Sequence, residues 1–141
     1  MRNWYLIKTK SRQEHVAIKN LENQKYSTYC PTITIKNKHI VLFPGYLFIH
    51  LDKERENWSP IRSTKGVVNF VRFGLNFAQV PDTVIKFLKS NEHIHKEKFS
   101  NLNSFKLGDK IQITDGVFKN CVAIFKSSRP QERVLLLMQI L

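Results

Sequence analysis

Basic side chains gather around the first expected helix of this chain. Residues 11–24 carry a helical pattern, and Arg12, His15 and Lys19 share one face of it at i, i+3 and i+7 spacing. Two lysines end the strand expected just before this helix: Lys8 and Lys10. Such cations can bind backbone phosphates, although an ordinary solvated helix face has the same spacing.

Residues for bond chemistry are missing from the sequence. It has no glycine-rich phosphate loop, nucleophile elbow or HExxH motif, and its five glycines are scattered over expected turns. Cys30 and Cys121 are too few and too far apart for a disulfide framework, and the five histidines do not combine with them at metal-ligand spacing. We therefore expect no catalytic residue, no metal site, no cofactor and no enzyme activity.

Large aromatic residues crowd the segment 42–74. Phe43, Tyr46, Phe48, Phe70 and Phe73 lie in two strand-like runs, with Arg62, Lys65 and Arg72 among them. Exposed aromatic clusters often mark a contact with a partner. Packing in the core is the alternative, because side chains alternate along a strand and some of these rings must point inward.

The net charge of the chain indicates what kind of partner it binds. The 141 residues include 23 Lys and Arg against 11 Asp and Glu, a formal net charge of +12, which favours a polyanionic partner such as nucleic acid. Nonspecific solubility and affinity for anionic lipids are the alternatives. No secretion signal or membrane span is visible, so we expect a cytoplasmic protein without a membrane partner.

The order of elements indicates an α+β fold. Residues 3–10 predict a strand, and Ser11 with Glu14 predicts a capping box at the start of the following helix. Strands come next, and a second helix begins near Pro81. This order predicts a largely antiparallel sheet with helices on one face.

The composition changes after the second helix. We expect a domain over residues 1–92, a linker over residues 93–104 and a short module over residues 105–141. Residues 110–114 alternate like a strand, whereas the apolar pattern of residues 117–141 fits both strands and buried helices.

Four segments, taken in order, resemble the NusG family of transcription elongation factors, and most closely its specialised RfaH-type paralogues. They are "NWYLIKTK", "LFPGYLFIHL", "KGVVNFVRFG" and "GDKIQITDGVFKNCVAIF". The resemblance implies a first domain that binds the clamp of RNA polymerase, and then a small KOW β-barrel. It implies a factor that suppresses pausing and termination, acts as a monomer and performs no bond chemistry.

The resemblance also implies the contact residues. The clamp helices of polymerase would contact an aromatic strand and the second helix, through Phe43, Pro44, Tyr46, Phe48, Ile85 and Leu88. Nontemplate-strand DNA would contact the first helix and the segment before "GVVNFVRFG", through Lys10, Arg12, Gln13, His15, Asn20, Gln24, Arg62, Thr64, Lys65 and Arg72. Among these, Gln13, Asn20 and Thr64 would bond base edges.

The carboxyl-terminal module departs from the family pattern. Family barrels have about two strands more than the segment that ends at Leu141, so residues 105–141 predict either a truncated β-module or a docked helical hairpin of the kind that RfaH adopts. Arg133 matches an RfaH arginine that holds the two domains together, but the partner glutamate is replaced by Ile40 or Val41. The short module argues against contact with a ribosomal protein or Rho.

Two other functions fit the same sequence. An RNA-binding module of the RRM type has a similar strand order, and "GYLFIHL" resembles its aromatic central strand. A nucleoid or ribosome accessory protein is the third hypothesis.

Overall fold

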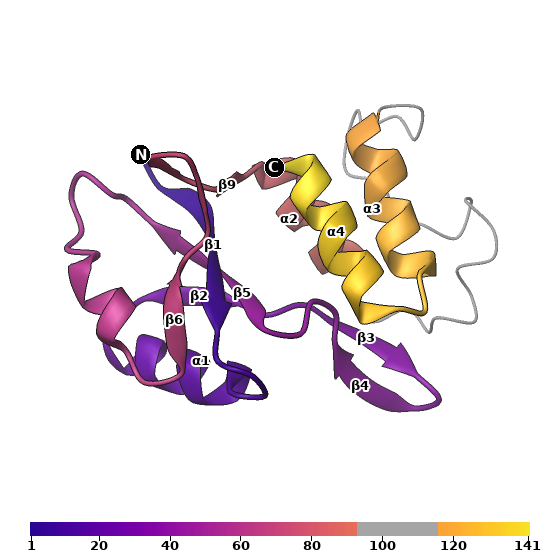
Figure 1. Ribbon diagram of the computed structural model, residues 1–141, viewed down its shortest axis with the longest axis horizontal. Helices are drawn as coiled ribbons and strands as arrows, with labels where there is room; N and C mark the ends of the chain where they lie inside the picture. Colours follow the sequence, from indigo (N-terminus) through magenta and orange to yellow (C-terminus); the bar gives the residue numbers. More distant parts are fainter. Residues whose placement is uncertain (93–115) are drawn as a thin grey trace. The chain divides into compact units, whose positions relative to one another are not determined.

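The computed structural model describes residues 1–92 and 116–141 (Figure 1). The chain divides into two compact units, which we name by their content. The sheet unit comprises Met1–Cys30 and Pro44–Val80, and the helical unit comprises Pro31–Phe43 and Pro81–Leu141. The predicted division at residues 92 and 105 follows the sequence order, whereas these units interleave two segments each. The predicted linker, residues 93–104, and the predicted strand, residues 110–114, lie outside the described residues.

Strand β1 (Asn3–Thr9) is the centre of the sheet unit. It pairs antiparallel with β5 (Tyr46–Leu51), β6 (Val67–Phe70) and β9 (Gln79–Val80). Strand β2 (Ser27–Tyr29) extends the sheet beyond β5, which gives the order β2-β5-β1-β6 (Figure 1). The predicted antiparallel α+β fold is confirmed.

One face of this sheet carries the core of the unit. Helix α1 (Glu14–Asn23) packs on this face through Ala17 and Leu21, and the 3₁₀ helix η1 (Ser59–Ser63) packs on it through Ile61. The strands contribute alternating residues, as a pleated sheet requires. These residues are Tyr5, Ile7, Leu47, Ile49, Leu51, Val67 and Phe70.

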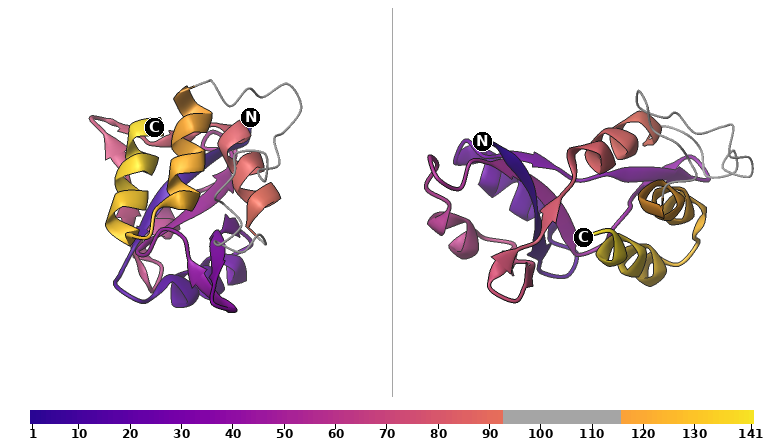
Figure 2. Two further views of the ribbon diagram at one scale, coloured as in Figure 1. Left: turned by 90° about the vertical axis from the view of Figure 1, so that its right-hand side faces the viewer. Right: turned by 90° about the horizontal axis from the view of Figure 1, so that it is seen from above.

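A two-stranded ribbon follows β6 in the sheet unit. It pairs β7 (Arg72–Phe73) with β8 (Asn76–Phe77) across a two-residue turn, Gly74–Leu75. Gly74 has a φ of +66°, which suits glycine at the first position of a tight hairpin turn. The ribbon projects from the sheet, and it is the short rose hairpin between β6 and β9 in the right-hand view of Figure 2.

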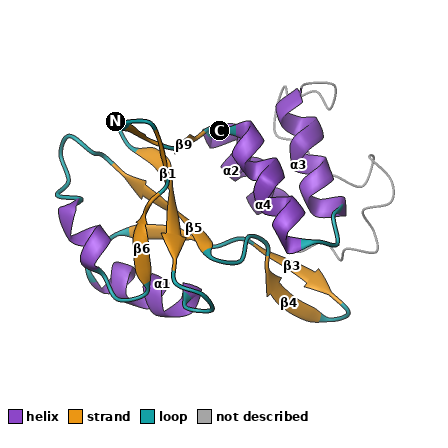
Figure 3. Cartoon of the chain, in the orientation of Figure 1, coloured by secondary structure: helices purple, strands orange, loops and turns teal. Residues whose placement is uncertain are grey.

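The described residues of the helical unit form one hairpin and three helices (Figure 3). Strands β3 (Thr32–Ile35) and β4 (Lys38–Val41) form the hairpin. The helices are α2 (Asp82–Asn91), α3 (Gly116–Lys126) and α4 (Pro130–Ile140). The last two lie side by side and antiparallel (Figure 2). Of the two forms predicted for the carboxyl-terminal module, the described residues adopt the helical one, and the β form is wrong for residues 116–140.

Packing inside the helical unit explains this choice. Phe118, Cys121, Val122 and Phe125 recur at i, i+3, i+4 and i+7 and are all buried, which is the stripe of an amphipathic helix. Phe87 of α2 lies near two of these side chains, with ring centroids 6.0 Å from Phe118 and 6.1 Å from Phe125. Strand alternation would have pointed half of this stripe away from its partners.

The predicted capping box at Ser11 is wrong. Helix α1 begins at Glu14 and its N-cap residue is Gln13, which makes no side-chain capping bond. The backbone amide of Gln13 donates to the carbonyl of Lys10 at 3.0 Å, so residues 10–13 form a turn. Arg12 has a φ of +58°, a left-handed conformation that no right-handed helix contains.

Gly66 allows the loop after η1 to lie directly on α1. Its φ is +92°, and a Cβ atom built at this position would lie 2.7 Å from the backbone nitrogen of Ala17. Only glycine fits such a close approach of two backbones at that φ without a rearrangement. The position of the Lys65–Gly66 loop therefore depends on residue 66 having no side chain.

Replacing Gly66 with Ala should lower the free energy of unfolding by about 2–4 kcal/mol, because a clash adds to left-handed strain. The matched control is Gly74→Ala, which has the same kind of φ but no atom within 4 Å of the new Cβ. It should cost only about 1 kcal/mol. Urea unfolding of both variants measures the difference, and equal losses would show that the contact with Ala17 is unimportant.

Candidate nucleic-acid and protein interfaces

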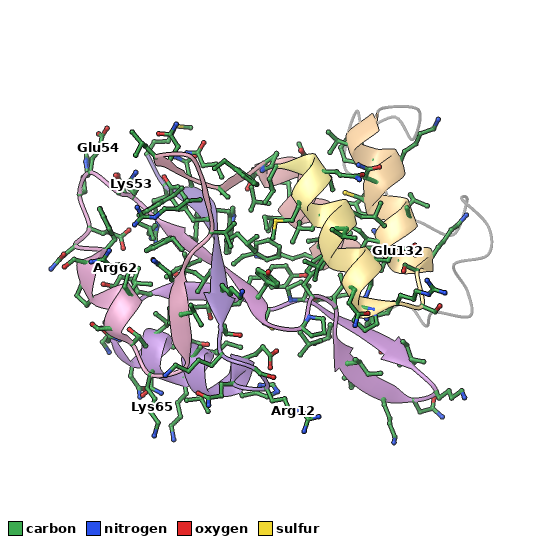
Figure 4. All side chains as sticks on the ribbon, in the orientation of Figure 1. Arg12, Lys53, Glu54, Arg62, Lys65 and Glu132 are labelled. Atoms are coloured by element: carbon green, nitrogen blue, oxygen red, sulfur yellow. The ribbon has the colours of Figure 1, made fainter. Side chains whose placement is uncertain are left out.

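Three of the predicted DNA-binding cations are brought to one edge of the sheet unit, together with His15. The amide of Lys10 donates to the carbonyl of Gly66 at 2.9 Å, so the turn before α1 lies beside the loop that carries Lys65. Arg12 and Lys65 project from this edge, whereas Arg62 on η1 lies away from Arg12, toward the loop of Lys53 and Glu54 (Figure 4). We call the exposed side chains of this edge the basic patch: Lys10, Arg12, His15 and Lys65.

The polar residues predicted to read bases have partners within the unit. Thr64 is buried, and its hydroxyl donates to the carbonyl of Pro60 at 2.9 Å and accepts from Nε2 of Gln24 at 2.9 Å. The side-chain Nε2 of Gln24 also donates to the backbone carbonyl of Asn20 at 3.0 Å, and the side-chain Nδ2 of Asn20 donates to the backbone carbonyl of Val16 at 2.8 Å. These groups brace α1 against η1, and only Gln13 of the predicted base readers is outside this network.

Arg72 is not part of the basic patch. Its guanidinium carbon lies 4.9 Å from the centre of the Phe77 ring. That ring contacts Tyr5 with a centroid separation of 6.2 Å, near the start of β1, whereas Lys10 follows the end of β1. The family resemblance grouped Arg72 with the other cations, whereas the structure places it toward the start of β1 and Lys10 beyond its end.

Glu14 links the basic patch to the aromatic strand β5. Its carboxylate is buried and accepts a hydrogen bond from the Gly45 amide at 2.7 Å. The carbonyl of Gly45 accepts from the Thr9 amide at 2.8 Å. The turn that opens β5 is thus fastened to the end of β1 and to the first turn of α1. Sequence reasoning assigned Glu14 to a capping box and missed this bond, because nothing in the local spacing points to Gly45.

Replacing Glu14 with Ala should destabilise the chain by about 1–3 kcal/mol, because the Gly45 amide loses its acceptor in a partly buried place. Glu14→Gln keeps a carbonyl oxygen on a side chain of the same length and should recover most of that loss. Thermal unfolding of the two variants provides the measurement. A Gln variant as unstable as the Ala variant would mean that the charge of Glu14 matters more than the hydrogen bond.

Aromatic side chains line the second face of the sheet. Trp4 stacks on His50 with centroids 4.5 Å apart and an interplanar angle of 12°, and Tyr29 stacks on Phe48 at 6.1 Å and 24°. Tyr46 belongs to the same face of β5, two residues before Phe48. Both helical elements of the sheet unit pack on the opposite face. The sheet therefore carries apolar side chains on both faces.

The six predicted clamp residues differ in exposure and in unit. Pro44 is exposed, Tyr46 is half-buried and Phe48 is buried, and all three belong to the sheet unit. Phe43, Ile85 and Leu88 belong to the helical unit and are buried, with at most 2% of each side chain exposed. The structure therefore presents only Pro44 and Tyr46 at the surface.

Arg133 has an unusual environment within the helical unit. It is only 1% exposed, and it donates from Nε to the carbonyl of Leu42 at 2.8 Å and from Nη1 to the carbonyl of Ser127 at 3.0 Å. No carboxylate pairs with it among residues 1–92 and 116–141. Burial lowers the pKa of this guanidinium. Where the family resemblance implied a glutamate near residues 40 and 41, a backbone carbonyl at the next residue accepts the bond.

Both cysteine thiols have a raised pKa. Burial raises the pKa of Cys121 to about 12, and burial together with the charge of Glu14 raises the pKa of Cys30 to about 11. No cluster of His, Cys, Asp or Glu within the described part of the chain is suited to a metal ion. No helix in that part has the length and apolar character to span a bilayer.

Comparison with known proteins shows the family. A family model described as "Transcription termination factor nusG" matches residues 2–89, which cover the sheet unit, the β3–β4 hairpin and most of α2. The chain belongs to the NusG family. The predicted resemblance is confirmed at this level, and the RRM alternative is set aside.

Individual relatives agree with this assignment. The NusG transcription termination/antitermination protein of Chlamydia trachomatis is 27% identical over 141 residues, which cover 88% of this chain and 77% of that protein. The protein of the same name from Thermus thermophilus is 27% identical over 153 residues, covering 91% and 83%. These relatives are NusG proteins, and they support the family without indicating an RfaH-type specialisation.

A solved structure supports the fold. A structure of Thermotoga maritima NusG, described as showing domain interaction, matches with a TM-score of 0.51 and 23% sequence identity. The match covers 62% of this chain and 55% of that one, so this chain spans just over half of the solved NusG chain.

Proposed function

We propose that this NusG-family chain is a transcription elongation and antitermination factor that binds RNA polymerase and the nontemplate DNA strand together. The observation that carries the proposal is the bond between Glu14 and Gly45, which fastens the basic patch to the strand with the aromatic face. A rigid unit with both surfaces can hold an unpaired DNA strand next to the enzyme that opened it. Through this contact the factor keeps the polymerase clamp closed and suppresses pausing.

The basic patch supplies the DNA contact in this proposal. Its cations are exposed, and the described residues give Lys10, Arg12 and Lys65 no carboxylate partner. Free cations of this kind gain from counterion release when they meet phosphates. Because Thr64, Asn20 and Gln24 brace the fold, we assign most of the affinity to backbone contacts and leave base reading to Gln13.

The second face of the sheet supplies the polymerase contact. Tyr46 is half-buried at the edge of a row of rings, and Pro44 is exposed beside it. Tyrosine side chains at the rim of an apolar surface are common anchors of protein interfaces. The clamp helices of polymerase are the partner implied by the family resemblance, with the buried Phe48 supporting Tyr46 from within.

An RfaH-type role is the finer form of this proposal. Helices α3 and α4 occupy the carboxyl-terminal region where the family resemblance implied a β-barrel. A helical module of this size does not present the barrel surface of general NusG proteins. We therefore favour recruitment to selected transcription complexes over a general role.

Reversing the charge of the basic patch should strongly weaken binding to a transcription complex with an open bubble. Lys10→Glu with Lys65→Glu removes two phosphate contacts and adds repulsion, so the affinity at 0.1 M salt should fall about tenfold or more. The measurement is retention of polymerase, assembled on a bubble template, by the tagged full chain.

The matched control makes the same charge change in the helical unit. Lys86→Glu with Lys119→Glu replaces two exposed lysines and should leave retention nearly unchanged. Equal retention by both double variants would exclude the basic patch as the DNA contact.

Replacing Tyr46 with Ala should weaken binding to free polymerase about tenfold, as expected for an interface anchor, without changing the affinity for bare DNA. Tyr46 is a better probe than Phe48, since truncating a buried ring also leaves a destabilising cavity. Surface-immobilised polymerase gives the first affinity and a labelled oligonucleotide the second. A parallel loss of both would indicate a damaged fold rather than a lost contact.

A further inference from the structure

Two cations converge on one aromatic ring in the sheet unit, at a place that the proposed interfaces do not use. Nζ of Lys53 lies 4.5 Å from the centre of the Phe77 ring and 6.0 Å from that of Trp58. The guanidinium carbon of Arg72 lies 4.9 Å from the same Phe77 centre. We call Lys53 and Arg72 the cation pair.

The ring beneath the cation pair is firmly held. Phe77 stacks on Phe70 with centroids 4.1 Å apart and an interplanar angle of 4°, and it meets Trp58 edge-on at 5.0 Å. A cation over the face of an aromatic ring is attracted by the negative charge of that face. These contacts restrict two long side chains that would otherwise move freely, so a ligand that binds both heads meets a smaller entropic cost.

The cation pair has no anion of its own. The two heads lie within about 10 Å of each other, the Debye length at 0.1 M salt, so each raises the potential at the other. Neither forms an ion pair in the described part of the chain. The nearby carboxylate of Asp52 is already paired with the amino terminus at 2.8 Å. Glu54, the next residue after Lys53, is exposed at the end of the loop (Figure 4).

An exposed apolar tip adjoins the cation pair. Phe73 follows Arg72 directly and is 47% exposed, and Leu75 in the turn is 95% exposed. Phe73 pairs with Asn76, so it lies on the opposite face of the ribbon from Arg72 and Phe77. A single strand of nucleic acid that crosses the edge of this ribbon would place its backbone next to the cation pair and a base next to the Phe73 ring.

Phosphates and bases are the groups that this combination fits. We propose that the cation pair binds a backbone phosphate of single-stranded nucleic acid and that Phe73 stacks on a neighbouring base. Aromatic rings next to cations are how sequence-tolerant single-strand sites are built. A net charge of +12 draws such a polyanion to the whole surface.

This site extends the DNA contact of the proposed function and rests on it. The Phe77 ring contacts Tyr5, and Lys10 of the basic patch comes five residues later, a distance of about 16 Å along β1. Together the two sites would hold a longer stretch of one strand than the basic patch alone. DNA and RNA share the chemistry that the site recognises, so both serve as probes.

The test measures binding of the full chain to labelled oligo(dT) and oligo(rU) at several salt concentrations. Lys53→Gln with Arg72→Gln should reduce the slope of log affinity against log salt by about 0.7, because the cation pair binds one phosphate and each lost phosphate contact accounts for about 0.7 on a single strand. Glu54→Gln should bind equally well or more tightly. The basic-patch variant Lys10→Gln with Lys65→Gln is the reference.

Phe73 variants test stacking separately from charge. Phe73→Ala should weaken binding about 5- to 100-fold, whereas Phe73→Trp keeps a π-face and should bind like the unaltered chain. Phe73→Leu retains an apolar side chain but no ring, and should lose affinity like the Ala variant. Leu75→Ala is the control at the tip and should have no effect. A stronger effect for RNA or for DNA identifies the source of the strand.

The outcomes separate this inference from the proposed function. If only the basic-patch variant changes the salt slope, the cation pair is not a nucleic-acid site and the proposed DNA contact remains. If Phe73→Leu binds normally, the tip does not stack on a base. If neither double variant alters the slope, both DNA contacts are wrong. Thermal unfolding of every variant guards against loss of the fold, and only variants that melt within a few degrees of the unaltered chain are compared.

Discussion

The antiparallel pairing of β1 with β5 determines the layout of the sheet unit. Its register places Leu6 opposite Phe48 and Tyr5 opposite Ile49, so consecutive pairs alternate between the two faces. A shift of one residue would exchange every side chain between the faces. One face then carries the core with α1 and η1, and the other keeps a row of stacked rings. The two proposed binding functions are separated by this alternation before any loop is considered.

The cations of the basic patch are positioned by the loops at the end of this sheet. The chain positions its basic patch with backbone contacts: the Lys10 amide bonds the Gly66 carbonyl, and Gly66 lies against Ala17. The side chains at the surface are thereby left to interact with solvent or a ligand. Polar side chains that a base could have used, such as Thr64, serve instead to fix α1 against η1. Rigid placement of a few cations, with little base-specific chemistry, suits a contact dominated by phosphates.

Much of the fold could be predicted because local patterns and the global fold agree in the sheet unit. The strand pattern of residues 3–10 and the start of α2 near Pro81 both follow from sequence, and the family segments put them in order. Features that depend on distant partners could not be predicted. Glu14 matched a capping box because its true partner, Gly45, is 31 residues away. Arg12 has a left-handed backbone conformation that excludes a helix starting at Ser11, and the helix propensity of arginine does not predict that conformation.

In the candidate sites too, features set by local sequence could be predicted and features set by distant contacts could not. Cations near α1 were found from spacing and charge, while Lys53 was missed because it lies in a charged, irregular segment and meets Phe77 only through the tertiary fold. The exposure of the aromatic residues could not be predicted from the sequence. Phe43, Tyr46 and Phe48 are all large aromatic residues of one apolar segment, but only Tyr46 is half-buried and the other two are buried. For residues 117–141 the apolar pattern fitted two structures, and packing of α3 against Phe87 decided between them.

The environment of Arg133 has a consequence for how the helical unit responds to its surroundings. A carboxylate partner would take up a proton in acid and release the guanidinium, but the carbonyls of Leu42 and Ser127 do not titrate. Acidification therefore has no direct means of breaking these two bonds. The attachment of α4 to the chain after β4 should therefore tolerate acid that would weaken an ion pair at the same place.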